Sequence, residues 1–379
     1  MSLLTLNHKL RSSSAEAEQA SALLEELAFR YGRSSESYLV TEPGRKYFWL
    51  PNQTGVIVYL RRGRYLHVGG GLLAAEADKP ALLVAFTQWA SASRLRPMFY
   101  NIAPDEVPLF RETGFQVTKW GEEAVIDLST ASWKGKRFEW VRRQSNYALR
   151  HGLHFVECRP ERLTADAWHR LSQELTEVSN GILSERPQIG DIGFLNGRFD
   201  PSLIGRRRLF LARQKVQGRI DGFLVCNPCR GGNEWALELY RDRPDAVRGT
   251  IPFLMHQALQ LFQQEQIERA SLCLVPGVRC DRPLPGDSAL IRHAMVLSQY
   301  FSFIFDVAGL YHFKSRFRPR FEDRFICAYP AVTLGAACSF IGLCGALRLN
   351  SVKLVRRLWR QLRYSRSRST LAAPPSETL

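Results

Sequence analysis

The sequence is short of acidic residues. Its 379 residues include 52 Lys+Arg against 36 Asp+Glu, which leaves a formal net charge of +16. This balance favours polyanionic partners, either nucleic acid or anionic lipid headgroups. With 45% hydrophobic and 23% charged residues, the composition excludes a chain that is mainly disordered.

Long apolar runs and cysteines are also scarce. Charges recur throughout the first 330 residues, which excludes a multi-pass membrane protein. His8 and Lys9 interrupt the N-terminal stretch, so we expect no signal peptide and a cytoplasmic location. Eight cysteines are too few for a disulfide scaffold. The lone C-x-x-C, Cys226 and Cys229, lacks a second tight pair; we interpret it as a turn with buried thiols and expect no metal and no cofactor.

The order of patterns predicts an α/β (α+β) protein built from two similar units. In each unit we expect short strands, a helix, a strand, a second helix and a last strand. The elements of the first unit are predicted at 47–50, 55–59, 65–68, 79–93, 98–102, 106–113 and 115–117. Those of the second are predicted at 209–212, 218–226, 234–240, 251–264, 270–275, 288–300, 310–317 and 325–329, with 310–317 taken as a strand. This order describes tandem GNAT-like (N-acetyltransferase-like) domains.

We therefore divide the chain into six segments. They are a polar, helical segment (1–35), a first GNAT-like domain (36–130), linking helices (131–180), a second, catalytic GNAT-like domain (181–330), an apolar and basic tail (331–364) and a disordered end (365–379). In GNAT proteins a glycine-rich loop before a helix cradles a pyrophosphate. The corresponding stretch here, 240–250, has one glycine, which argues against acetyl-CoA.

The tail combines an uncharged stretch, 331–347, with a basic amphipathic stretch, 352–363. The first is at the lower length limit of a membrane-spanning helix. The second resembles an interfacial helix, for which we expect membrane contacts by Arg356, Arg357, Trp359 and Arg360. The alternative is a hairpin packed on the body of the protein.

Several motifs occur together in a fixed order. They are Lys119-Trp-Gly-Glu-Glu-Ala124 with Asp127-Leu128, Gly135-Lys-Arg137 with Arg142-Arg143 and Gly152, Gly193-Phe-Leu-Asn-Gly-Arg-Phe-Asp200, Glu238-Leu-Tyr-Arg241 with Gly249-Thr250, and Tyr311-x-Phe-Lys-x-Arg-Phe-x-Pro319 with Arg324 and Ala328-Tyr-Pro330. Their sequence and spacing resemble the C-terminal synthase domain of the phosphatidylglycerol lysyltransferase family, the multiple peptide resistance factors.

The resemblance implies an aminoacyltransferase that moves an amino acid from aminoacyl-tRNA to a hydroxyl of an anionic membrane lipid such as phosphatidylglycerol. It also implies a location at the inner face of the cell membrane. Larger members carry a flippase, so a separate membrane flippase is an expected partner of a free-standing synthase. The chain departs from the family pattern at Val247, Pro252, 272–278 and Gly69–Gly71, which leaves the amino acid and the lipid open.

Four residues are our candidates for catalysis. Glu238 would hold the donor's ammonium group or orient the attacking hydroxyl; alternatively it pairs with Arg241 or Arg243. Arg241 is suited to a bidentate phosphate or carboxylate contact. On a strand, Lys314 and Arg316 would share one face and bind a phosphate, or form a solvated basic face. Tyr311 is a proton relay or a core tyrosine.

Further candidates come from the same motifs. For substrate binding we expect Arg316, Asp245, Gly249, Thr250 and Arg324. For tRNA binding we expect Lys136, Arg137, Arg142 and Arg143, which alternate with aromatic residues; the alternative is an amphipathic helix that covers the seam between domains. We interpret Arg206-Arg207-Arg208 as a turn in solvent.

Two other functions remain open from the sequence. One is an acyltransferase that uses acetyl-CoA or another acyl donor on the same fold. The other is a catalytically inactive module that binds membranes or tRNA, which Pro252 and the altered 272–278 loop make credible.

Overall fold

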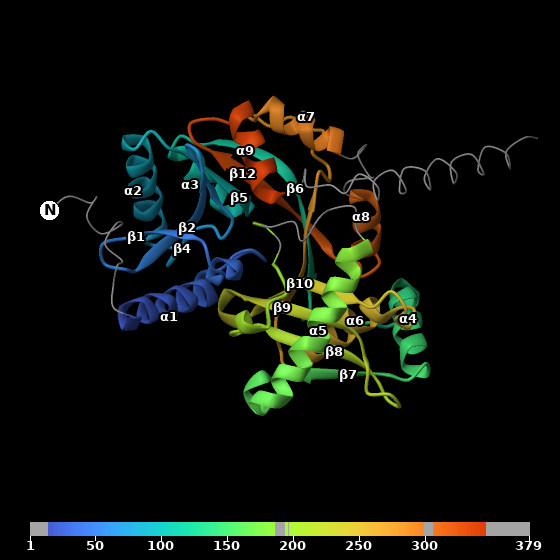
Figure 1. Ribbon diagram of the computed structural model, residues 1–379. Coiled ribbons are helices and arrows are strands. Elements are labelled where there is room, and N and C mark those ends of the chain that lie inside the picture. Colours follow the sequence, from blue (N-terminus) through green and yellow to red (C-terminus); the bar gives the residue numbers. More distant parts are fainter. Residues whose placement is uncertain (1–13, 186–193, 196, 299–305, 346–379) are drawn as a thin grey trace, which may run out of the picture.

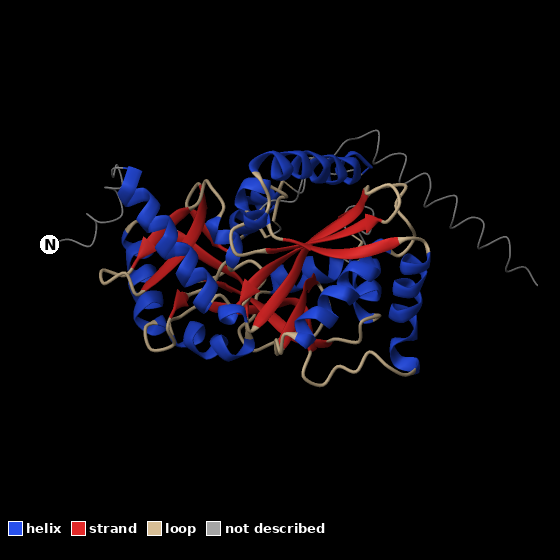
Figure 2. Ribbon diagram, turned by 90° about the horizontal axis from the view of Figure 1, so that it is seen from below, coloured by secondary structure: helices blue, strands red, loops and turns tan. Residues whose placement is uncertain are grey.

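The computed structural model describes residues 14–185, 194–195, 197–298 and 306–345. Within these residues the strands form one 12-stranded mixed sheet in the order β1-β2-β3-β5-β12-β6-β11-β10-β9-β8-β7, with β4 paired to β2. Figure 1 shows the sheet running through the whole molecule, and Figure 2 shows helices on both of its faces. The mixed α/β prediction is confirmed.

The first half of the chain follows the predicted order. Its elements are α1 (Ser14–Tyr31), β1 (Lys46–Trp49), β2 (Gly55–Arg62), β3 (Tyr65–Val68), β4 (Leu73–Ala74), α2 (Lys79–Ala92), β5 (Arg96–Ile102), α3 (Val107–Glu112) and β6 (Gln116–Asp127). Pro80 and Pro108 lie in the first turns of α2 and α3, where the missing N–H costs no helical hydrogen bond. Gly114, with φ +85°, ends the turn that follows α3.

The second half repeats this order with additions. Its elements are α4 (Glu139–Arg150), β7 (Leu153–Cys158), α5 (Ala165–Glu185), β8 (Arg208–Gln214), β9 (Ile220–Cys229), β10 (Glu234–Asp242), α6 (Thr250–Gln264), β11 (Arg269–Pro276), α7 (Ala289–Ser298), α8 (Val307–Ser315), β12 (Arg320–Ala328) and α9 (Leu334–Cys344). The stretch 131–180 therefore holds a strand, β7, besides its two helices.

The two units exchange their last strands. β12 ends the second unit but lies between β5 and β6 of the first, and β6 ends the first unit but pairs with β11 of the second. In each unit the strand before this exchange is parallel to the last hairpin strand: β5 to β3, and β11 to β10. The exchange brings residues that are far apart in sequence into neighbouring strands at the centre of the sheet.

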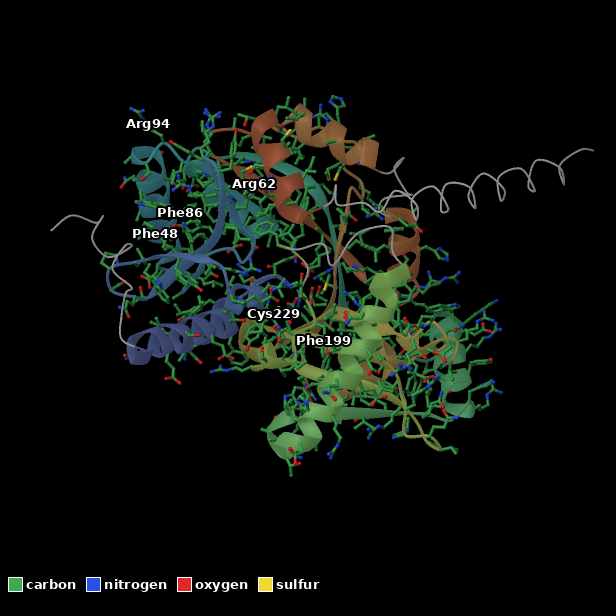
Figure 3. The ribbon with its side chains drawn as sticks, in the orientation of Figure 1. Phe48, Arg62, Phe86, Arg94, Phe199 and Cys229 are labelled. Atoms are coloured by element: carbon green, nitrogen blue, oxygen red, sulfur yellow. The ribbon has the colours of Figure 1, made fainter. Side chains whose placement is uncertain are left out.

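Hydrophobic layers cover both faces of each half. In the first half, α2 and α3 pack on one face, and aromatic pairs such as Phe48–Phe86 fill the layer (Figure 3). In the second half, α4 and α6 cover one face and α5 the other. Buried aliphatic and aromatic side chains supply the main driving force for this arrangement.

Two local predictions are wrong. Residues 310–317 are mostly helical, because α8 begins after Asp306, whose carboxylate accepts a hydrogen bond from the Gly309 N–H at 2.8 Å. The aromatic residues of this stretch alternate as they would on a strand, which explains the wrong prediction. Cys226 and Cys229 have buried thiols as expected, but both lie within strand β9 and not in a turn.

The start of the tail packs on the protein. α9 spans 11 residues. The Ser339 hydroxyl lies 2.9 Å from Nε2 of His67 in β3, and the Phe340 ring stacks on the Tyr100 ring of β5 with 4.7 Å between the ring centroids. None of the helices within the described residues is long and apolar enough to cross a membrane. The sequence left open whether 331–347 spans the membrane, lies on it or packs on the body of the protein; its described part forms the short helix α9, which packs on the body. Arg356, Arg357, Trp359, Arg360 and the segment 365–379 lie outside the described residues.

Candidate active site

The sheet opens between β10 and β11. These parallel strands pair only from Glu234 to Ala236 and from Arg269 to Ser271, and then diverge. Beyond this point β10 continues along β9, and β11 continues along β6. Both strands carry an irregularity where they part, and a bulge of this kind turns a side chain away from its regular direction. On β10 the residue at the irregularity is Glu238.

Glu238 is partly buried and accepts a hydrogen bond from the Gly197 N–H at 2.6 Å. A Cβ atom on residue 197 would lie 2.7 Å from the other carboxylate oxygen, so a larger residue there would displace the Glu238 carboxylate. Burial raises the pKa of Glu238, while the Gly197 N–H and the nearby Arg207 charge oppose that rise. The carboxylate thus has a backbone partner, whereas the alternative partner Arg243 contacts Glu174 at 3.6 Å.

Lys314 lies on the other side of this opening. It is 4% exposed, and its Nζ donates to the carbonyl oxygens of Cys273 and Leu274, each at 3.0 Å. Cys273 has φ +66° and its thiol donates to the Leu237 carbonyl at 3.5 Å, so it bridges the two diverging strands. Burial lowers the pKa of Lys314 to about 8, which places a neutral amine within reach of neutral pH.

Arg316 and Tyr311 contact other parts of the protein than Lys314 does. Because α8 is a helix, residues two positions apart point in different directions, and the shared face predicted for Lys314 and Arg316 is wrong. Arg316 lies over the Trp140 ring of α4 at 5.6 Å. The Tyr311 ring stacks on Phe321 at 4.8 Å.

Arg241 lies on the same strand as Glu238. It is 7% exposed and donates to the Tyr240 carbonyl at 3.0 Å. Its charge lowers the pKa of Glu238, as does the charge of Arg207. The structure therefore brings Glu238, Arg241 and Lys314 to one region of the sheet.

The loop before α6 is held by an internal carboxylate. Asp221 is fully buried and accepts hydrogen bonds from the Val247 N–H at 3.0 Å, from the Gln214 amide at 2.9 Å and from Arg219 at 3.1 Å. Asp245 is exposed and pairs with Arg219 at 2.7 Å, which lowers its pKa. The Thr250 hydroxyl donates to the Val247 carbonyl at 2.6 Å, and Gly249 has φ +87°. These three candidates shape the loop.

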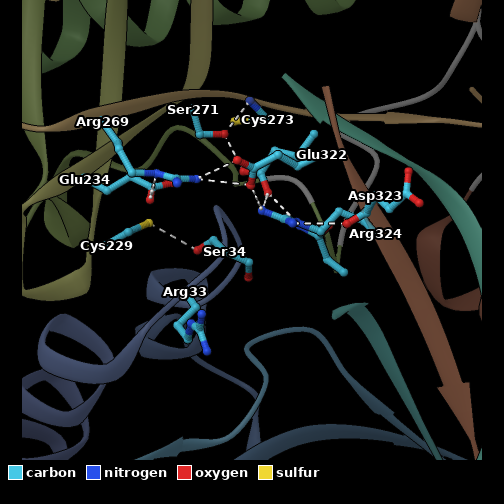
Figure 4. A network of polar contacts seen from close by, with 12 residues as sticks. Arg33, Ser34, Cys229, Glu234, Arg269, Ser271, Cys273, Glu322, Asp323 and Arg324 are labelled. Carbon is cyan, nitrogen blue, oxygen red and sulfur yellow. Dashed lines mark hydrogen bonds and ion pairs between the residues drawn. The ribbon is translucent and has the colours of Figure 1, made fainter. Parts of the chain in front are cut away.

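Arg324 is placed inside the protein, where the exchanged strands meet. It is 2% exposed and its Nε donates to Glu123 of β6 at 2.6 Å; Ser271 of β11 donates to the same carboxylate. Figure 4 shows the surrounding network, in which Arg269 contacts both Glu234 and Glu322 at 3.1 Å. Arg324 thus joins β12, β6 and β11, and its guanidinium is committed to the protein's own carboxylates.

Sequence reasoning missed a second buried carboxylate beside this network. Glu36, 4% exposed, accepts a hydrogen bond from the Asn101 amide, and burial raises its pKa to about 7, helped by the negative charge of Glu123. Glu123 lay within the quoted Lys119–Ala124 motif, which was the available signal. Glu36 follows α1 and offered no pattern.

The basic residues around α4 form an exposed surface. Lys136, Arg137 and Arg143 are exposed, whereas Arg142 donates to the carbonyls of Trp133 at 3.0 Å and Gly135 at 2.7 Å and so closes the preceding turn. The opposite face of α4 packs on α6, so the helix is amphipathic, as the alternative interpretation also required.

The stretch Arg206–Arg208 is solvated only in part: Arg206 is exposed as predicted, whereas Arg207 is buried and Arg208 is half-buried. Arg207 is 8% exposed and pairs with Glu42 at 3.3 Å, while Arg208 pairs with Glu157 at 2.7 Å. Sequence could not reveal these partners because they lie on distant elements.

The diverging parallel strands and the two-unit sheet define a GNAT-like fold. The chain belongs to the phosphatidylglycerol lysyltransferase C-terminal family, whose sequence model matches residues 25–328. A phosphatidylglycerol lysyltransferase of Bacillus subtilis is 23% identical over 312 residues, which cover 82% of this chain and 35% of that protein. The chain therefore spans about a third of the length of the curated relatives it matches.

Two solved structures have a similar fold. The C-terminal domain of a protein assigned as a lysylphosphatidylglycerol synthetase from Agrobacterium fabrum has a TM-score of 0.73 at 22% identity, covering 88% of this chain and 99% of that one. L-PGS from Bacillus licheniformis has a TM-score of 0.72 at 21% identity, covering 86% and 95%.

Proposed function

We propose that the protein is an aminoacyltransferase that moves an amino acid, lysine in the first instance, from aminoacyl-tRNA to a hydroxyl of phosphatidylglycerol or a related membrane lipid. The observation that carries the proposal is the opening between β10 and β11, with Glu238 and Lys314 on its two sides. Family membership and the names of the relatives support the reaction class.

The reaction exchanges one ester for another. The lipid hydroxyl attacks the ester carbonyl of the aminoacyl-tRNA, the new lipid ester forms, and the bond to the tRNA ribose oxygen breaks. The proton leaves the lipid hydroxyl and ends on that ribose oxygen. No ATP is needed, because the aminoacyl ester is already activated; the protein must position the groups and move the proton.

Lys314 is suited to this proton transfer. A neutral amine has two N–H bonds, and the carbonyl oxygens of Cys273 and Leu274 can accept both. Its lone pair is then available for the proton of the lipid hydroxyl. The lowered pKa, about 8, makes the neutral form accessible without a strong base.

Glu238 is suited to binding the donor. One of its oxygens is held by the Gly197 N–H, and the second oxygen can accept a hydrogen bond from the α-ammonium group of the aminoacyl ester. Arg241, on the same strand, supplies positive charge for a phosphate or for the developing oxyanion.

The exposed cations on and near α4 are the proposed tRNA surface. Lys136, Arg137 and Arg143 would contact phosphates, and Arg316 over Trp140 lies next to them through α8. Binding to the inner leaflet of the cell membrane is part of the same proposal, as is cooperation with a separate flippase.

The loop before α6 favours this function over acetyl-CoA. A pyrophosphate would need free N–H groups in this loop, but the Val247 N–H already donates to the buried Asp221 carboxylate. A pyrophosphate would have to compete with the Asp221 carboxylate for this N–H. The site is therefore poorly suited to a CoA donor.

A donor screen tests the proposal. The full chain is incubated with phosphatidylglycerol vesicles and separate tRNA pools, each charged with one labelled amino acid, and the lipid is extracted. We expect label in the lipid from one or a few pools, and none after ribonuclease treatment of the tRNA or from free amino acid with ATP.

Three results would contradict it. Label that survives ribonuclease would exclude tRNA as the donor. Turnover of acetyl-CoA without transfer from any pool would indicate an acyltransferase. Binding of vesicles or tRNA with neither activity would indicate an inactive module.

A further inference from the structure

A hollow of about 390 Å³ lies far from the opening, over the edge of the second half of the sheet. It is lined by Val156, Glu157, Cys158, Arg159, Arg162, Leu163, Leu171, Leu211 and Arg213. Its size falls within the range of small-molecule sites. A second hollow, beside Arg33 and Asn101, has about 10 Å³ and is too small for more than a water molecule.

The hollow lies beside α5, which contributes Leu171 to its lining. α5 packs mainly against β9 and β10, and it shares one hydrophobic cluster with residues of the outer strands β7 and β8. Val156 of β7 lies opposite Leu211 of β8 in the register, and both line the hollow next to this cluster. Leu163 and Leu171 close the sides, and Leu163 is 38% exposed. The floor is therefore apolar and open to solvent.

The rim is positively charged. Arg159, Arg162 and Arg213 line it, against the single carboxylate of Glu157, which Arg208 holds at 2.7 Å and Arg159 at 3.0 Å. Arg213 also has a buried Nε atom without a hydrogen-bond partner among the described residues. Guanidinium groups gathered around one rim suit an anionic ligand such as a phosphate.

We propose that this groove binds an anionic phospholipid, with its phosphate against the arginine rim and an acyl chain along the floor formed by Val156, Leu163, Leu171 and Leu211. The apolar floor distinguishes this ligand from a nucleic acid, whose bases would require aromatic or polar partners. The lipid here is a docking ligand, distinct from the acceptor at the β10–β11 opening, and its binding does not depend on the transfer reaction.

Photocrosslinking tests the groove in the full chain. Vesicles of phosphatidylcholine containing phosphatidylglycerol with a photoreactive acyl chain are irradiated with the protein, and the modified peptides are mapped. We expect adducts in 156–163 and at Leu171. Arg162→Glu should reduce their yield roughly fivefold, since each basic residue near an anionic surface contributes appreciably to binding. Leu163→Asp should reduce it as much. Both positions are exposed, so folding should be retained.

Arg94→Glu is the matched control, because Arg94 is an exposed arginine in the first half of the molecule (Figure 3). It should leave the groove adducts unchanged. Adducts confined to other segments would overturn the proposal. Protection by inorganic phosphate as strong as that by unlabelled lipid would show a simple anion site, and protection by uncharged tRNA would show a nucleic-acid site; either result would overturn it. Transfer to detergent-solubilised lipid, measured in parallel, reports on the proposed function separately.

Discussion

The two units have the same strand order but use the equivalent opening differently. In the second unit, β10 and β11 part around Glu238 and Lys314. In the first, β3 and β5 pair from Tyr65 to Val68 and then part around aromatic rings. There the Tyr100 ring lies 5.4 Å from Phe194 and 4.7 Å from Phe340. The second opening holds an acidic and a basic side chain, whereas the first is filled by packed rings.

Two residues that are close in sequence, Phe194 and Gly197, contribute to the two openings. Phe194 fills the first, close to Gly69, and Gly197 donates its N–H to Glu238 in the second. The two units thus offer similar frames, of which the first is packed with aromatic rings and the second, in our proposal, carries the chemistry. Each of the following predictions tests this division.

The largest effect is expected at Lys314. Lys314→Met should lower the transfer rate roughly a thousandfold, because it removes the proposed proton acceptor. The wild-type rate should rise with pH as the neutral amine becomes more populated, reach half of its maximum near the Lys314 pKa of about 8 and level off above it. Single-turnover transfer assays across pH measure both.

Lys215→Met is the control, since Lys215 is exposed on the turn between β8 and β9. It should leave rate and pH profile unchanged. A Lys314→Met protein with a normal melting temperature and a normal rate would remove Lys314 from the chemistry.

The largest effect on the free energy of unfolding is expected where the exchanged strands β6 and β12 meet. Arg324→Met leaves Glu123 buried without its cation, and we expect a loss of about 3–5 kcal/mol in the free energy of unfolding. Urea denaturation measures this loss. Arg320→Met, at an exposed pair on the same strand, should cost about 1 kcal/mol or less. Equal losses in the two variants would contradict the structural role assigned to Arg324.

His67 tests the filled opening by pH. Its Nδ1 lies 2.8 Å from the Tyr100 hydroxyl, and its Nε2 lies 2.9 Å from the Ser339 hydroxyl. Burial lowers the pKa of the His67 ring from 6.5 to about 4. The unfolded chain therefore binds the proton more readily, so His67 should reduce stability as pH falls from 6.5 to 4, by roughly 3 kcal/mol in total.

Comparing denaturation curves over this range isolates the contribution of His67. His67→Gln should flatten the dependence, and His169→Gln, at an exposed position on α5, should not. A transfer rate that changes strongly in His67→Gln, at constant stability, would assign chemistry to the first opening.

Glu238→Gln should weaken use of the charged donor. Losing a hydrogen bond to a charged group costs about 2 kcal/mol, roughly thirtyfold in kcat/KM for aminoacyl-tRNA. Steady-state kinetics with varied donor measures this change. Glu268→Gln, at an exposed position before β11, should have no effect. An unchanged kcat/KM in Glu238→Gln would remove Glu238 from donor binding.

The smallest effect on transfer is expected at Phe340. Phe340→Ala should cost about 2 kcal/mol of stability, because it leaves a cavity beside Tyr100. The transfer rate should stay within about twofold of wild type under conditions where the variant is folded. A large fall in rate would show that the first opening does more than stabilise.

Much of the fold was predictable because its signals are local. Aromatic and β-branched strands, the helices of each unit and the repeated order were read from short patterns, as was the motif that contains Glu123. The helix α8 was not, since Phe313 and Phe317 alternate as they would on a strand. The exposure of Arg207 was misjudged because its partner, Glu42, is 165 residues away.

The class of fold, the family resemblance and the excess of positive charge follow from the amino-acid sequence alone, because composition and short motifs carry these properties. The exchange of β6 and β12, the burial of Arg324 with Glu123 and the approach of Gly197 to Glu238 became visible only in the folded protein. These features depend on contacts between distant segments, whose free energy arises from burial and from the pairing of charges in the interior.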